Sequence, residues 1–396
     1  MALVIESAVE NCTGYIVIDS FDGGTSSGGT RITSDVELEE IKALAREMTF
    51  KFRFFDLKRG GAKSGIRVPS GLSKVELRQA LQNFGASIAP IIQKGLYYPG
   101  TDLGCGPEEL AAIYRGAGIE LGPQTDTAFY TAMTVGAALE VCKEVWYGKE
   151  TRVRVAIEGF GKVGAHLAER LDPSRYIIIA VSTAIGARCN EKGFDPAKLV
   201  AMRGKYGDDF VIHFSEGSQA TKEEVLAADA DILVPSARTW SIRPDNAGSI
   251  KAHVIVPAAN VPYAAGSLDI LKGKDVLCIP GFVSNAGGVL GSTLKDRGMS
   301  EAHIQGIVDR LYRPLVESLV LLSKKMGASP VALAEESVLK NKSSKKPFAN
   351  QSNGIMAVAC RLLARSRFVR RRNNARYIDN VLDNLSEKTA FFASGT

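Results

Sequence analysis

The pattern of apolar residues changes about a third of the way along the chain. Before residue 126, the β-branched and aromatic run at residues 14–21 predicts a strand, and apolar residues at helical spacing predict two helices after it. Each helix is expected to open with a capping box, the first at Ser34 and the second at Ser73. The glycine-rich stretches at residues 23–31 and 60–66 are interpreted as a turn and a loop.

After residue 126, short apolar runs alternate with helical segments. These runs are residues 153–157, 177–181, 231–235, 254–256 and 276–279. Strands that are apolar at nearly every position are typical of a parallel sheet buried on both faces. The pattern predicts an α/β protein with two domains, a mixed α/β domain at residues 1–126 and a parallel-sheet domain at residues 127–330. Helices at about residues 340–396 are expected to fold back on the first domain.

Composition excludes several classes of protein. Of the 396 residues, 45% are apolar and 23% are charged, which is ordinary for a protein with a sizeable core. No apolar run approaches the roughly 18 residues of a membrane span, and the N-terminus has acids in place of a basic leader. The six cysteines are scattered and the four histidines are isolated. We therefore expect no metal site, no membrane partner and a cytoplasmic location.

The net charge of +6 owes much to one stretch near the C-terminus. Residues 361–376 hold seven arginines and no acid. We interpret this stretch as a solvated helix face or a subunit contact, and we expect no nucleic-acid partner, because a basic patch is not the main feature of the sequence. Strong, salt-dependent binding to DNA of mixed sequence would favour the alternative.

A dinucleotide-binding motif follows the strand at residues 153–157. The sequence Gly-Phe-Gly-Lys-Val-Gly lies between this strand and a helix, and that context makes GxGxxG a specific signal. Gly159 allows the tight turn, Gly161 lets the backbone approach the pyrophosphate, and Gly164 allows close packing of helix and strand. The helix N-terminus supplies N–H groups for the phosphates. The predicted cofactor-binding residues of this turn are Gly159, Phe160, Gly161, Lys162, Val163 and Gly164. The motif predicts a Rossmann-type NAD(P)-binding domain, the alternative being an ordinary glycine-rich turn.

The end of the next strand bears on the choice of cofactor. In such domains this position commonly carries an acid that binds the ribose 2′-hydroxyl of NAD. Here Ser182 and Thr183 end the strand, no acid is present, and Arg188 lies five residues further on. These residues are assigned to the cofactor, and they favour the 2′-phosphate of NADP, with NAD as the alternative.

One lysine and one aspartate are candidates for acid–base chemistry. Lys63 lies inside the glycine-dense segment GGAKSG, where partial desolvation should lower its pKa towards neutral. Asp102 lies in a turn-rich segment from which a buried carboxylate could pair with this lysine. Taken alone, a lysine such as Lys63 is more often a surface residue or an anion binder, and an aspartate such as Asp102 is more often a helix cap.

The order of motifs over residues 14–300 resembles the glutamate/leucine/phenylalanine/valine dehydrogenases. The matching segments are GGTR (28–31), MTFK (48–51), GGAKSGI (60–66), PGTDLG (99–104), TAMTV (131–135), GFGKVG (159–164), PAAN (257–260) and PGFVSNAGGV (280–289). The resemblance implies an oxidoreductase that deaminates an L-amino acid to a 2-oxo acid and ammonia with NAD(P). It also implies a closed homo-oligomer formed through the first domain.

The resemblance assigns roles to individual residues. Lys51 would bind the substrate α-carboxylate, Lys63 would be the catalytic lysine, and Asp102 would carry protons to and from the amino nitrogen. Asn260 would position both substrate and nicotinamide. Two further residues, Thr131 and Asn285, are assigned to the cofactor.

The side-chain pocket departs from the glutamate enzymes of the family. By the same correspondence, the substrate side chain would contact Ser27, Gly100, Val289 and Ser292. Ser27 stands where those enzymes have a lysine that neutralises the glutamate side chain, and a buried carboxylate without a cation costs several kcal/mol. We therefore expect a bulky neutral amino acid, with glutamate as the alternative because another basic residue could enter the pocket.

Other departures and alternatives stay open. Thr134, Ala258 and Gly281 occupy positions where the family often has Gly, Gly and Asp. A catalytically silent nucleotide-binding homologue is the main alternative from another class, although silence would not require the retention of both lysines and Asp102. A hydroxy-acid enzyme would need a His–Asp or Tyr–Lys pair that the sequence does not offer.

Overall fold

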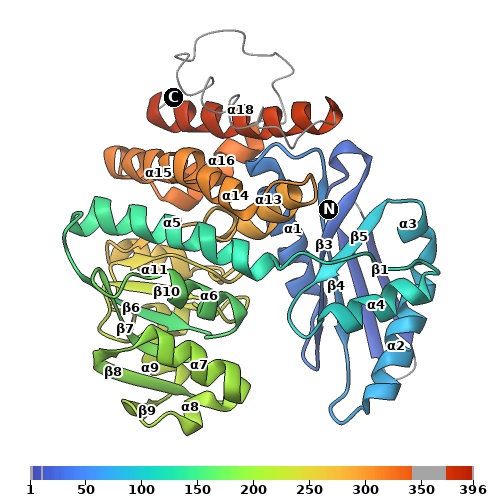
Figure 1. Cartoon of the computed structure of the whole chain (residues 1–396), viewed down its shortest axis with the longest axis horizontal. Coiled ribbons are helices and arrows are strands. Elements are labelled where there is room, and N and C mark those ends of the chain that lie inside the picture. Colours follow the sequence, from blue (N-terminus) through green and yellow to red (C-terminus); the bar gives the residue numbers. More distant parts are fainter. Residues whose placement is uncertain (1–2, 10–11, 341–371, 395–396) are drawn as a thin grey trace. The chain divides into compact units, whose positions relative to one another are not determined.

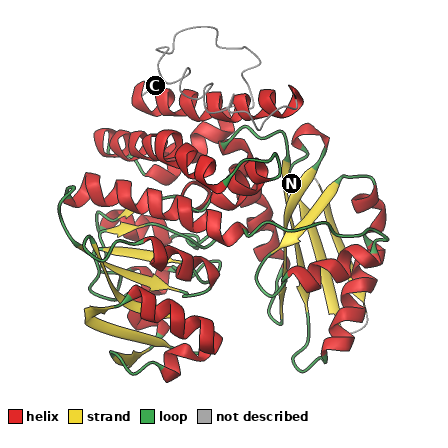
Figure 2. Cartoon of the chain, viewed as in Figure 1, coloured by secondary structure: helices red, strands yellow, loops and turns green. Residues whose placement is uncertain are grey.

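A computed structural model describes residues 3–9, 12–340 and 372–394 of the chain (Figure 1). The chain divides into two compact units, Met1–Thr125 and Asp126–Thr396. Each unit has its own β-sheet with helices packed against it (Figure 2). The α/β fold class predicted from the hydrophobic pattern is therefore confirmed.

The sheet of the first unit has five strands in the order β1-β2-β4-β3-β5. The pairs β1/β2 and β2/β4 are antiparallel, whereas β3 runs parallel to both β4 and β5. The strands are β1 (Leu3–Val9), β2 (Cys12–Ile18), β3 (Ser26–Thr33), β4 (Gly60–Arg67) and β5 (Tyr97–Thr101). The helices are α1 (Leu38–Phe54), α2 (Lys74–Ser87), α3 (Ala89–Gln93) and α4 (Pro107–Gly116).

Both glycine-rich segments of the first unit are mostly strand, so the turn and the loop expected there were wrong. A Cβ built on Gly28 in β3 would lie 1.6 Å from the carbonyl oxygen of Ala62 in β4. A Cβ built on Gly61 would lie 2.0 Å from the backbone nitrogen of Thr49 in α1. Glycine is needed in these strands because neighbouring backbones approach too closely for any side chain.

The two expected capping boxes have different outcomes. Ser73 accepts a hydrogen bond from the backbone N–H of Glu76, whose carboxylate accepts one from the N–H of Ser73, so the box at the start of α2 is confirmed. The box at Ser34 was wrong, because α1 begins at Leu38 after Glu37 with no side-chain cap. Helix α1 carries Glu39 and Glu40 in its first turn instead, which favours its N-terminus electrostatically.

The two faces of this sheet have different surroundings. Ala62 and Ile66 of β4 pack into a core with Leu81 of α2 and Ile113 of α4. Successive side chains of a strand point to opposite faces, so the residues between them point the other way. On that opposite face, a Cβ on Gly65 would meet Ile41 of α1. Helix α1 therefore covers the face of the sheet that carries Lys63.

The sheet of the second unit has seven strands in the order β12-β11-β10-β6-β7-β8-β9. The strands from β12 to β7 are parallel, and β8 and β9 continue the sheet antiparallel. The strands are β6 (Val153–Glu158), β7 (Tyr176–Ser182), β8 (Ala187–Phe194), β9 (Ser218–Ala220), β10 (Ile232–Pro235), β11 (Val254–Ile255) and β12 (Leu277–Cys278). The five apolar runs of this unit thus form the parallel Rossmann-type sheet.

Helices surround this sheet. They are α5 (Thr127–Tyr147), α6 (Lys162–Arg170), α7 (Pro196–Tyr206), α8 (Phe210–His213), α9 (Lys222–Leu226), α10 (Pro244–Ala247), α11 (Ser267–Gly273), α12 (Gly281–Ser284), α13 (Gly287–Lys295), α14 (Glu301–Ile307), α15 (Arg313–Met326), α16 (Pro330–Lys340) and α18 (Arg372–Ser394). Helices α13 and α15 both pack against α5. Within the described ranges, no helix is both long enough and apolar enough to cross a membrane.

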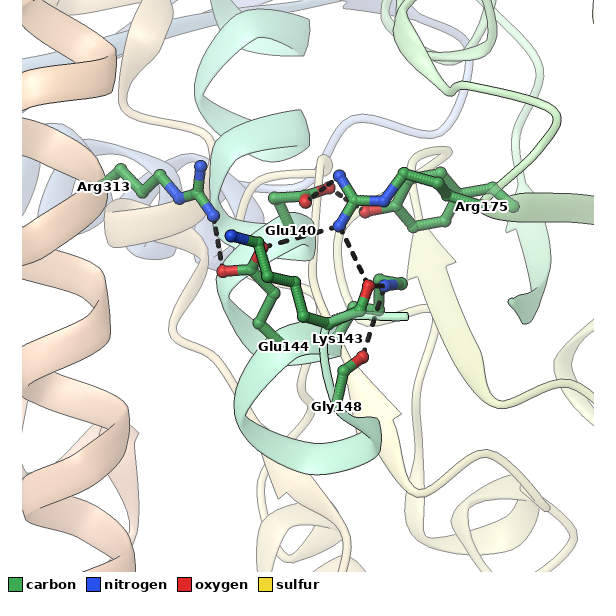
Figure 3. Close-up of polar contacts among 8 residues, drawn as sticks. Glu140, Lys143, Glu144, Gly148, Arg175 and Arg313 are labelled. Atoms are coloured by element: carbon green, nitrogen blue, oxygen red, sulfur yellow. Dashed lines mark hydrogen bonds and ion pairs between the residues drawn. The ribbon is translucent and has the colours of Figure 1, made fainter. Parts of the chain in front are cut away.

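Helix α5 is fixed at its C-terminal end by buried and half-buried charges (Figure 3). Glu144 accepts hydrogen bonds from Arg313 of α15 at 2.5 Å and from Arg175, which precedes β7, at 3.5 Å. The fully buried Lys143 donates to the carbonyl oxygen of Gly148, just after the helix end. These contacts connect α5 to the sheet and to α15 within the second unit.

Helix α18 packs against α15, and both belong to the second unit. The sequence instead led us to expect that residues of about 340–396 fold back on the first domain. Most of the arginine-rich stretch at 361–376 lies outside the described residues.

Candidate active site

Three strands of the first unit place candidate residues in rows on the face covered by α1. Ser27 of β3 pairs with Gly61 of β4 and with Tyr98 of β5. In the next row, Gly29 pairs with Gly100. Gly29 also lies level with Lys63, because the residues that follow them, Thr30 and Ser64, pair with each other. Neighbouring rows lie roughly 6–7 Å apart, at 3.3 Å for each residue.

The third row holds Arg31 beside Asp102. Asp102 follows β5, where it bridges to Cys105 rather than capping helix α4, whose N-cap is Gly106. Its Oδ2 atom lies 2.6 Å from Nζ of Lys63. Lys63 is only 2% exposed, so it is neither a surface residue nor a freely solvated cation. The predicted pairing of this lysine with this aspartate is present in the structure.

The charges in this cluster shift one another's protonation. Burial lowers the pKa of Lys63, and the Arg31 guanidinium adds to that effect, although the Asp102 carboxylate opposes it. Burial alone would raise the pKa of Asp102, but Lys63 and Arg31 together outweigh it and hold this pKa below its ordinary value. The pair therefore combines an amine that releases its proton more readily than usual with a carboxylate that stays ionised.

Lys51 reaches the same cluster from α1. It is 5% exposed, and burial lowers its pKa to about 8, with Lys63 adding to the decrease and Glu47 and Asp102 opposing it. A buried ammonium group near neutral pH is suited to bind an anion. The structure thus places Lys51, Lys63 and Asp102 within one charged cluster, although the first and the last of them are 51 residues apart in sequence.

The Ser27 end of the rows is small and partly open. A Cβ built on Gly100 would have no neighbour closer than 3.9 Å, so there is room beside Lys63 on this face. The hydroxyl of Ser27 donates to the carbonyl oxygen of Tyr98 at 3.0 Å. The sequence prediction missed Tyr98, which is 43% exposed, and Arg59, whose Cζ lies 5.6 Å from the centre of the Tyr98 ring.

In the second unit, the three glycines of the GFGKVG turn have distinct tasks. Gly159 has a φ of 95° and no room for a Cβ, which would lie 2.5 Å from the backbone nitrogen of Ala237. A Cβ on Gly164 would lie 2.8 Å from the carbonyl oxygen of Gly159, where helix and strand pack closely. A Cβ on Gly161 would meet nothing within 4 Å. The protein itself therefore does not require glycine at 161, but a ligand that touches the backbone there would.

The first turn of α6 is a suitable phosphate site. Gly161 is the N-cap and has no side chain to satisfy the N–H groups of Lys162 and the following residues. Phe160, by contrast, is fully buried against Phe210, so its contribution to the turn is through its backbone. An orphaned helix N-terminus and an open glycine both fit a dinucleotide.

Ser182 at the end of β7, Thr183 after it and Arg188 in β8 make hydrogen bonds within the fold. Ser182 accepts a hydrogen bond from the N–H of Gly159 at 3.0 Å, and the hydroxyl of Thr183 donates to the carbonyl oxygen of Asp208. Arg188 is 8% exposed, and its guanidinium donates to the carbonyl oxygens of Val211, Ile212 and Gly217. The predicted role of Arg188 in holding a 2′-phosphate is not what its contacts indicate, because its donors are used within the fold.

The remaining predicted residues of the second unit lie around α5 and α13. Thr131 donates to the carbonyl oxygen of Thr127 within α5, and Ser292 donates to that of Gly288 within α13. Val289 is in the same turn of α13 as Ser292, and Asn260 follows β11 on the loop to α11. The structure thus distributes the predicted substrate residues between the two units.

Asn285 and Thr134 are positioned by the junction of α5 with α13. The 2% exposed Asn285 donates to the carbonyl oxygen of Ala259 at 2.8 Å, while its own Oδ1 atom has no hydrogen-bond partner among the described residues. Thr134, which departs from the family pattern, accepts a hydrogen bond from the N–H of Gly287 at 2.9 Å. Its hydroxyl therefore helps to fix the start of α13.

A further carboxylate at the dinucleotide turn was missed by sequence reasoning. Glu158 ends β6 directly before Gly159 and is 6% exposed. Burial raises its pKa to about 7, although the nearby Ala237 N–H, Ser241 hydroxyl and Lys222 ammonium oppose the rise. An acid at the end of an apolar strand could have been flagged from the sequence, whereas its burial could not. Among the described residues, no group of three or more His, Cys, Asp or Glu side chains could hold a metal ion.

Family models match both units of the chain. The model of the Glu/Leu/Phe/Val dehydrogenase dimerisation domain matches residues 4–117, and that of glutamate/leucine/phenylalanine/valine dehydrogenase matches residues 120–304. The chain belongs to this family. It is therefore an oxidoreductase of the amino-acid dehydrogenase class, and the resemblance in the motifs is confirmed.

Individual relatives are glutamate dehydrogenases by name. The chain is 33% identical to glutamate dehydrogenase of Thermotoga maritima over 71% of either chain. It is 32% identical to NADP-specific glutamate dehydrogenase of Saccharolobus shibatae over 68% of this chain and 67% of the relative.

Two solved structures confirm the fold. The hetero-hexameric glutamate dehydrogenase of Thermus thermophilus has a TM-score of 0.71 at 24% identity, covering 87% of this chain and 89% of its own. L-tryptophan dehydrogenase of Nostoc punctiforme has a TM-score of 0.57 at 22% identity, covering 86% and 96%. At these identities the likeness concerns the fold alone.

Proposed function

We propose that this protein catalyses the reversible, NAD(P)-dependent oxidative deamination of an L-amino acid to a 2-oxo acid and ammonia. The observation that carries the proposal is the buried pair of Lys63 and Asp102, 2.6 Å apart, with Lys51 in the same charged cluster. A deamination needs an anion site for the α-carboxylate, a base near neutral pH and a group that accepts protons from nitrogen. This cluster offers all three.

Each side chain has a defined task in the proposed reaction. The Lys51 ammonium binds the α-carboxylate of the substrate. Loss of hydride from Cα leaves an iminium group, to which water adds while Lys63 in its neutral form takes a proton from that water. Asp102, which first takes a proton from the substrate ammonium group, returns it to the nitrogen after water has added. Ammonia then leaves and takes up the hydroxyl proton as the C=O bond of the 2-oxo acid forms, and Lys63 releases its proton to water. The lowered pKa values of Lys63 and Asp102 support these assignments.

The nicotinamide cofactor, when bound, supplies the hydride acceptor. Its pyrophosphate would lie at the first turn of α6, where Gly161 leaves open space, and the N–H groups of Lys162, Val163 and Gly164 would face it. NADP is the proposed cofactor, with NAD as the alternative, because Ser182 and Thr183 offer no carboxylate for a 2′-hydroxyl. The Saccharolobus relative is NADP-specific by name.

A bulky neutral side chain is the proposed substrate type. Ser27 is small, the space beside Gly100 is open, and the exposed ring of Tyr98 offers an apolar surface in the Ser27 row. Each buried CH₂ group contributes about 0.8 kcal/mol, so a large apolar group would gain more from this surface than a methyl group.

Glutamate is the second candidate, and one observation favours it. Arg59 lies over the Tyr98 ring, in the neighbourhood of Ser27, where the glutamate enzymes of the family have a lysine. No ion pair with a carboxylate is found for this arginine among the described residues. A guanidinium group held in this way could neutralise the side-chain carboxylate of glutamate.

Following NADPH and NADH absorbance decides among these candidates. The wild-type protein is assayed with the twenty amino acids, and with 2-oxo acids plus ammonia. The proposal predicts the highest kcat/KM for leucine, phenylalanine or tryptophan and no change in the variant Arg59→Gln. Glutamate as best substrate, with a loss of tenfold or more in Arg59→Gln but not in the exposed control Arg78→Gln, would favour the second candidate. No turnover with any amino acid or 2-oxo acid would refute the deamination.

We also propose that the chain forms a homo-oligomer through its first unit. The family model that matches residues 4–117 is described as a dimerisation domain, and the Thermus neighbour is named as a hetero-hexameric enzyme. Light scattering of the purified protein tests this proposal, and a monomer at micromolar concentration would refute it.

A further inference from the structure

We propose that Arg31 and Glu40 form a buried positioning pair for the reaction centre, in which Glu40 fixes the Arg31 guanidinium and Arg31 fixes the Asp102 carboxylate against Lys63. The inference rests on the proposed function, since it concerns the same site. Arg31 lies in the GGTR motif, to which no role was assigned, and Glu40 lies in the first turn of α1.

The contacts of Arg31 join a strand, a helix and the segment after β5. Its Nη1 atom lies 2.5 Å from Oε1 of Glu40, and its Nε atom lies 3.3 Å from Oδ2 of Asp102. The same Oδ2 atom lies 2.6 Å from Nζ of Lys63. One carboxylate oxygen is therefore shared by a lysine and an arginine, and the arginine is fixed from its other side by a second carboxylate.

Burial makes this arrangement selective for one geometry. Arg31 and Glu40 are 3% and 6% exposed, so without its partner neither would have any compensation for the hydration that it loses on burial. A guanidinium group is planar and donates along fixed directions, so the line from Glu40 to Asp102 is determined once Arg31 is in place. A lysine in its place could satisfy the charge but would not impose this direction.

Arg31 also differs chemically from Lys63. A guanidinium group stays protonated at any pH at which a protein is folded, whereas Lys63 gives up its proton in the proposed reaction. When Lys63 is neutral, Arg31 remains as a permanent cation on Asp102 and keeps that carboxylate ionised and in place. Glu40 balances this permanent charge, because otherwise Arg31 would leave the buried cluster with a surplus positive charge.

The two members of the pair act on Lys63 in opposite directions. Arg31 lowers the pKa of Lys63, and Glu40 raises it. The other titratable groups that interact with Lys63 or its partners come from α1, from the segment after β5 and from α4. They are Lys51, Glu47, Asp102, Cys105 and Glu109. The pair therefore acts on Lys63 electrostatically as well as joining β3 to α1.

The test compares the pH dependence of Lys63 in Arg31→Gln and Glu40→Gln. Trace acetylation with acetic anhydride, followed by mass spectrometry of the Lys63 peptide, reports the fraction of neutral amine without any enzyme assay. We expect the midpoint to move up by about one pH unit in Arg31→Gln and down by about half a unit in Glu40→Gln. The double variant should return towards the wild type, and the exposed control Glu39→Gln should not change it.

The same variants are then assayed for turnover. We expect kcat/KM to fall at least 100-fold in Arg31→Gln, with the acidic limb of the pH profile displaced in the same direction as the labelling midpoint, and Arg31→Lys to recover only part of the loss. Unmoved midpoints in both single variants, with lower melting temperatures, would overturn the proposal and leave a structural ion pair. If the wild type shows no deamination while the midpoints move as expected, the proposed function fails and the positioning pair stands.

Discussion

The cluster on the first unit and the glycine turn of the second unit are built by opposite means. The cluster, formed by Arg31, Glu40, Lys51, Lys63 and Asp102, depends on charged side chains taken out of water and paired with one another. The glycine turn, residues 159–164, depends on backbone N–H groups and on the absence of side chains. A charged cluster needs a tertiary structure to bring distant residues together, whereas a backbone site is specified by a few consecutive residues.

Two buried carboxylates, one in each unit, differ in the direction in which their surroundings shift the pKa. Asp102 has two cations beside it, and they hold its pKa below the ordinary value in spite of burial. Glu158 is buried beside the glycine turn, no ion pair with it is found in the described part of the chain, and its pKa rises to about 7 although Lys222 opposes the rise. Burial has the same sign at both places, and the neighbours decide the outcome.

Lys63→Ala should have the largest effect. Removing the amine takes away the proposed base, so kcat should fall by about 10²–10⁴-fold, the usual contribution of general acid–base catalysis. Binding of NADPH, followed by fluorescence titration, should stay within twofold of the wild type, because the glycine turn is unaltered. Lys58→Ala removes an exposed lysine of the same segment and serves as the control. Retained turnover in Lys63→Ala would remove this lysine from its role.

Glu158→Gln should change how stability depends on pH. With a pKa near 4.5 in the unfolded chain and about 7 in the folded one, Glu158 takes up a proton on folding at pH values between the two. Its contribution to stability is thus fully present below pH 4.5 and is lost as the pH rises through 7. At pH 8 the variant should exceed the wild type by up to about 3 kcal/mol, and at pH 4 the two should be alike.

Melting temperatures at the two pH values measure this difference. The exposed residue Glu150 provides the control variant Glu150→Gln, which should follow the wild type at both. Equal stabilisation of Glu158→Gln at pH 4 and pH 8 would contradict the raised pKa.

Arg188→Met tests the corrected role of this arginine. Leaving the carbonyl oxygens of Val211, Ile212 and Gly217 without their donor should lower stability by about 1–3 kcal/mol. The ratio of kcat/KM with NADPH to that with NADH should not change. A tenfold fall in this ratio, absent from the exposed control Arg152→Met, would restore Arg188 as a contact of the 2′-phosphate.

Gly161→Ala should have the smallest effect on the protein and a selective one on the cofactor. The backbone at 161 has a φ of −81°, which alanine adopts, and a Cβ there meets no protein atom. The melting temperature should stay unchanged while the Kd for NADPH rises about tenfold, or about 1.4 kcal/mol. Gly204→Ala, at another open glycine, should alter neither quantity. Gly159→Ala should instead lower the melting temperature, because of its positive φ and the nearby Ala237. Unchanged cofactor binding in Gly161→Ala would argue against the pyrophosphate lying there.

The sequence alone determined the parallel sheet, the strand–turn–helix around GFGKVG and the membership of the family. These features rest on local patterns, since consecutive apolar residues mark buried strands and three glycines at fixed spacing mark the turn. The positions of Lys63 and Asp102 could be nominated because their segments match the motifs of the family.

Only the tertiary structure decided how the charged groups meet. It turned two glycine-rich segments into neighbouring strands, because the backbones of β3, β4 and α1 approach too closely for side chains. It gave Arg188 a structural role, because the guanidinium group donates hydrogen bonds to three backbone carbonyl oxygens. It also brought Arg31 and Glu40 to Asp102, a meeting that no local pattern encodes, because pairing between distant charges depends on which faces of strand and helix are buried together.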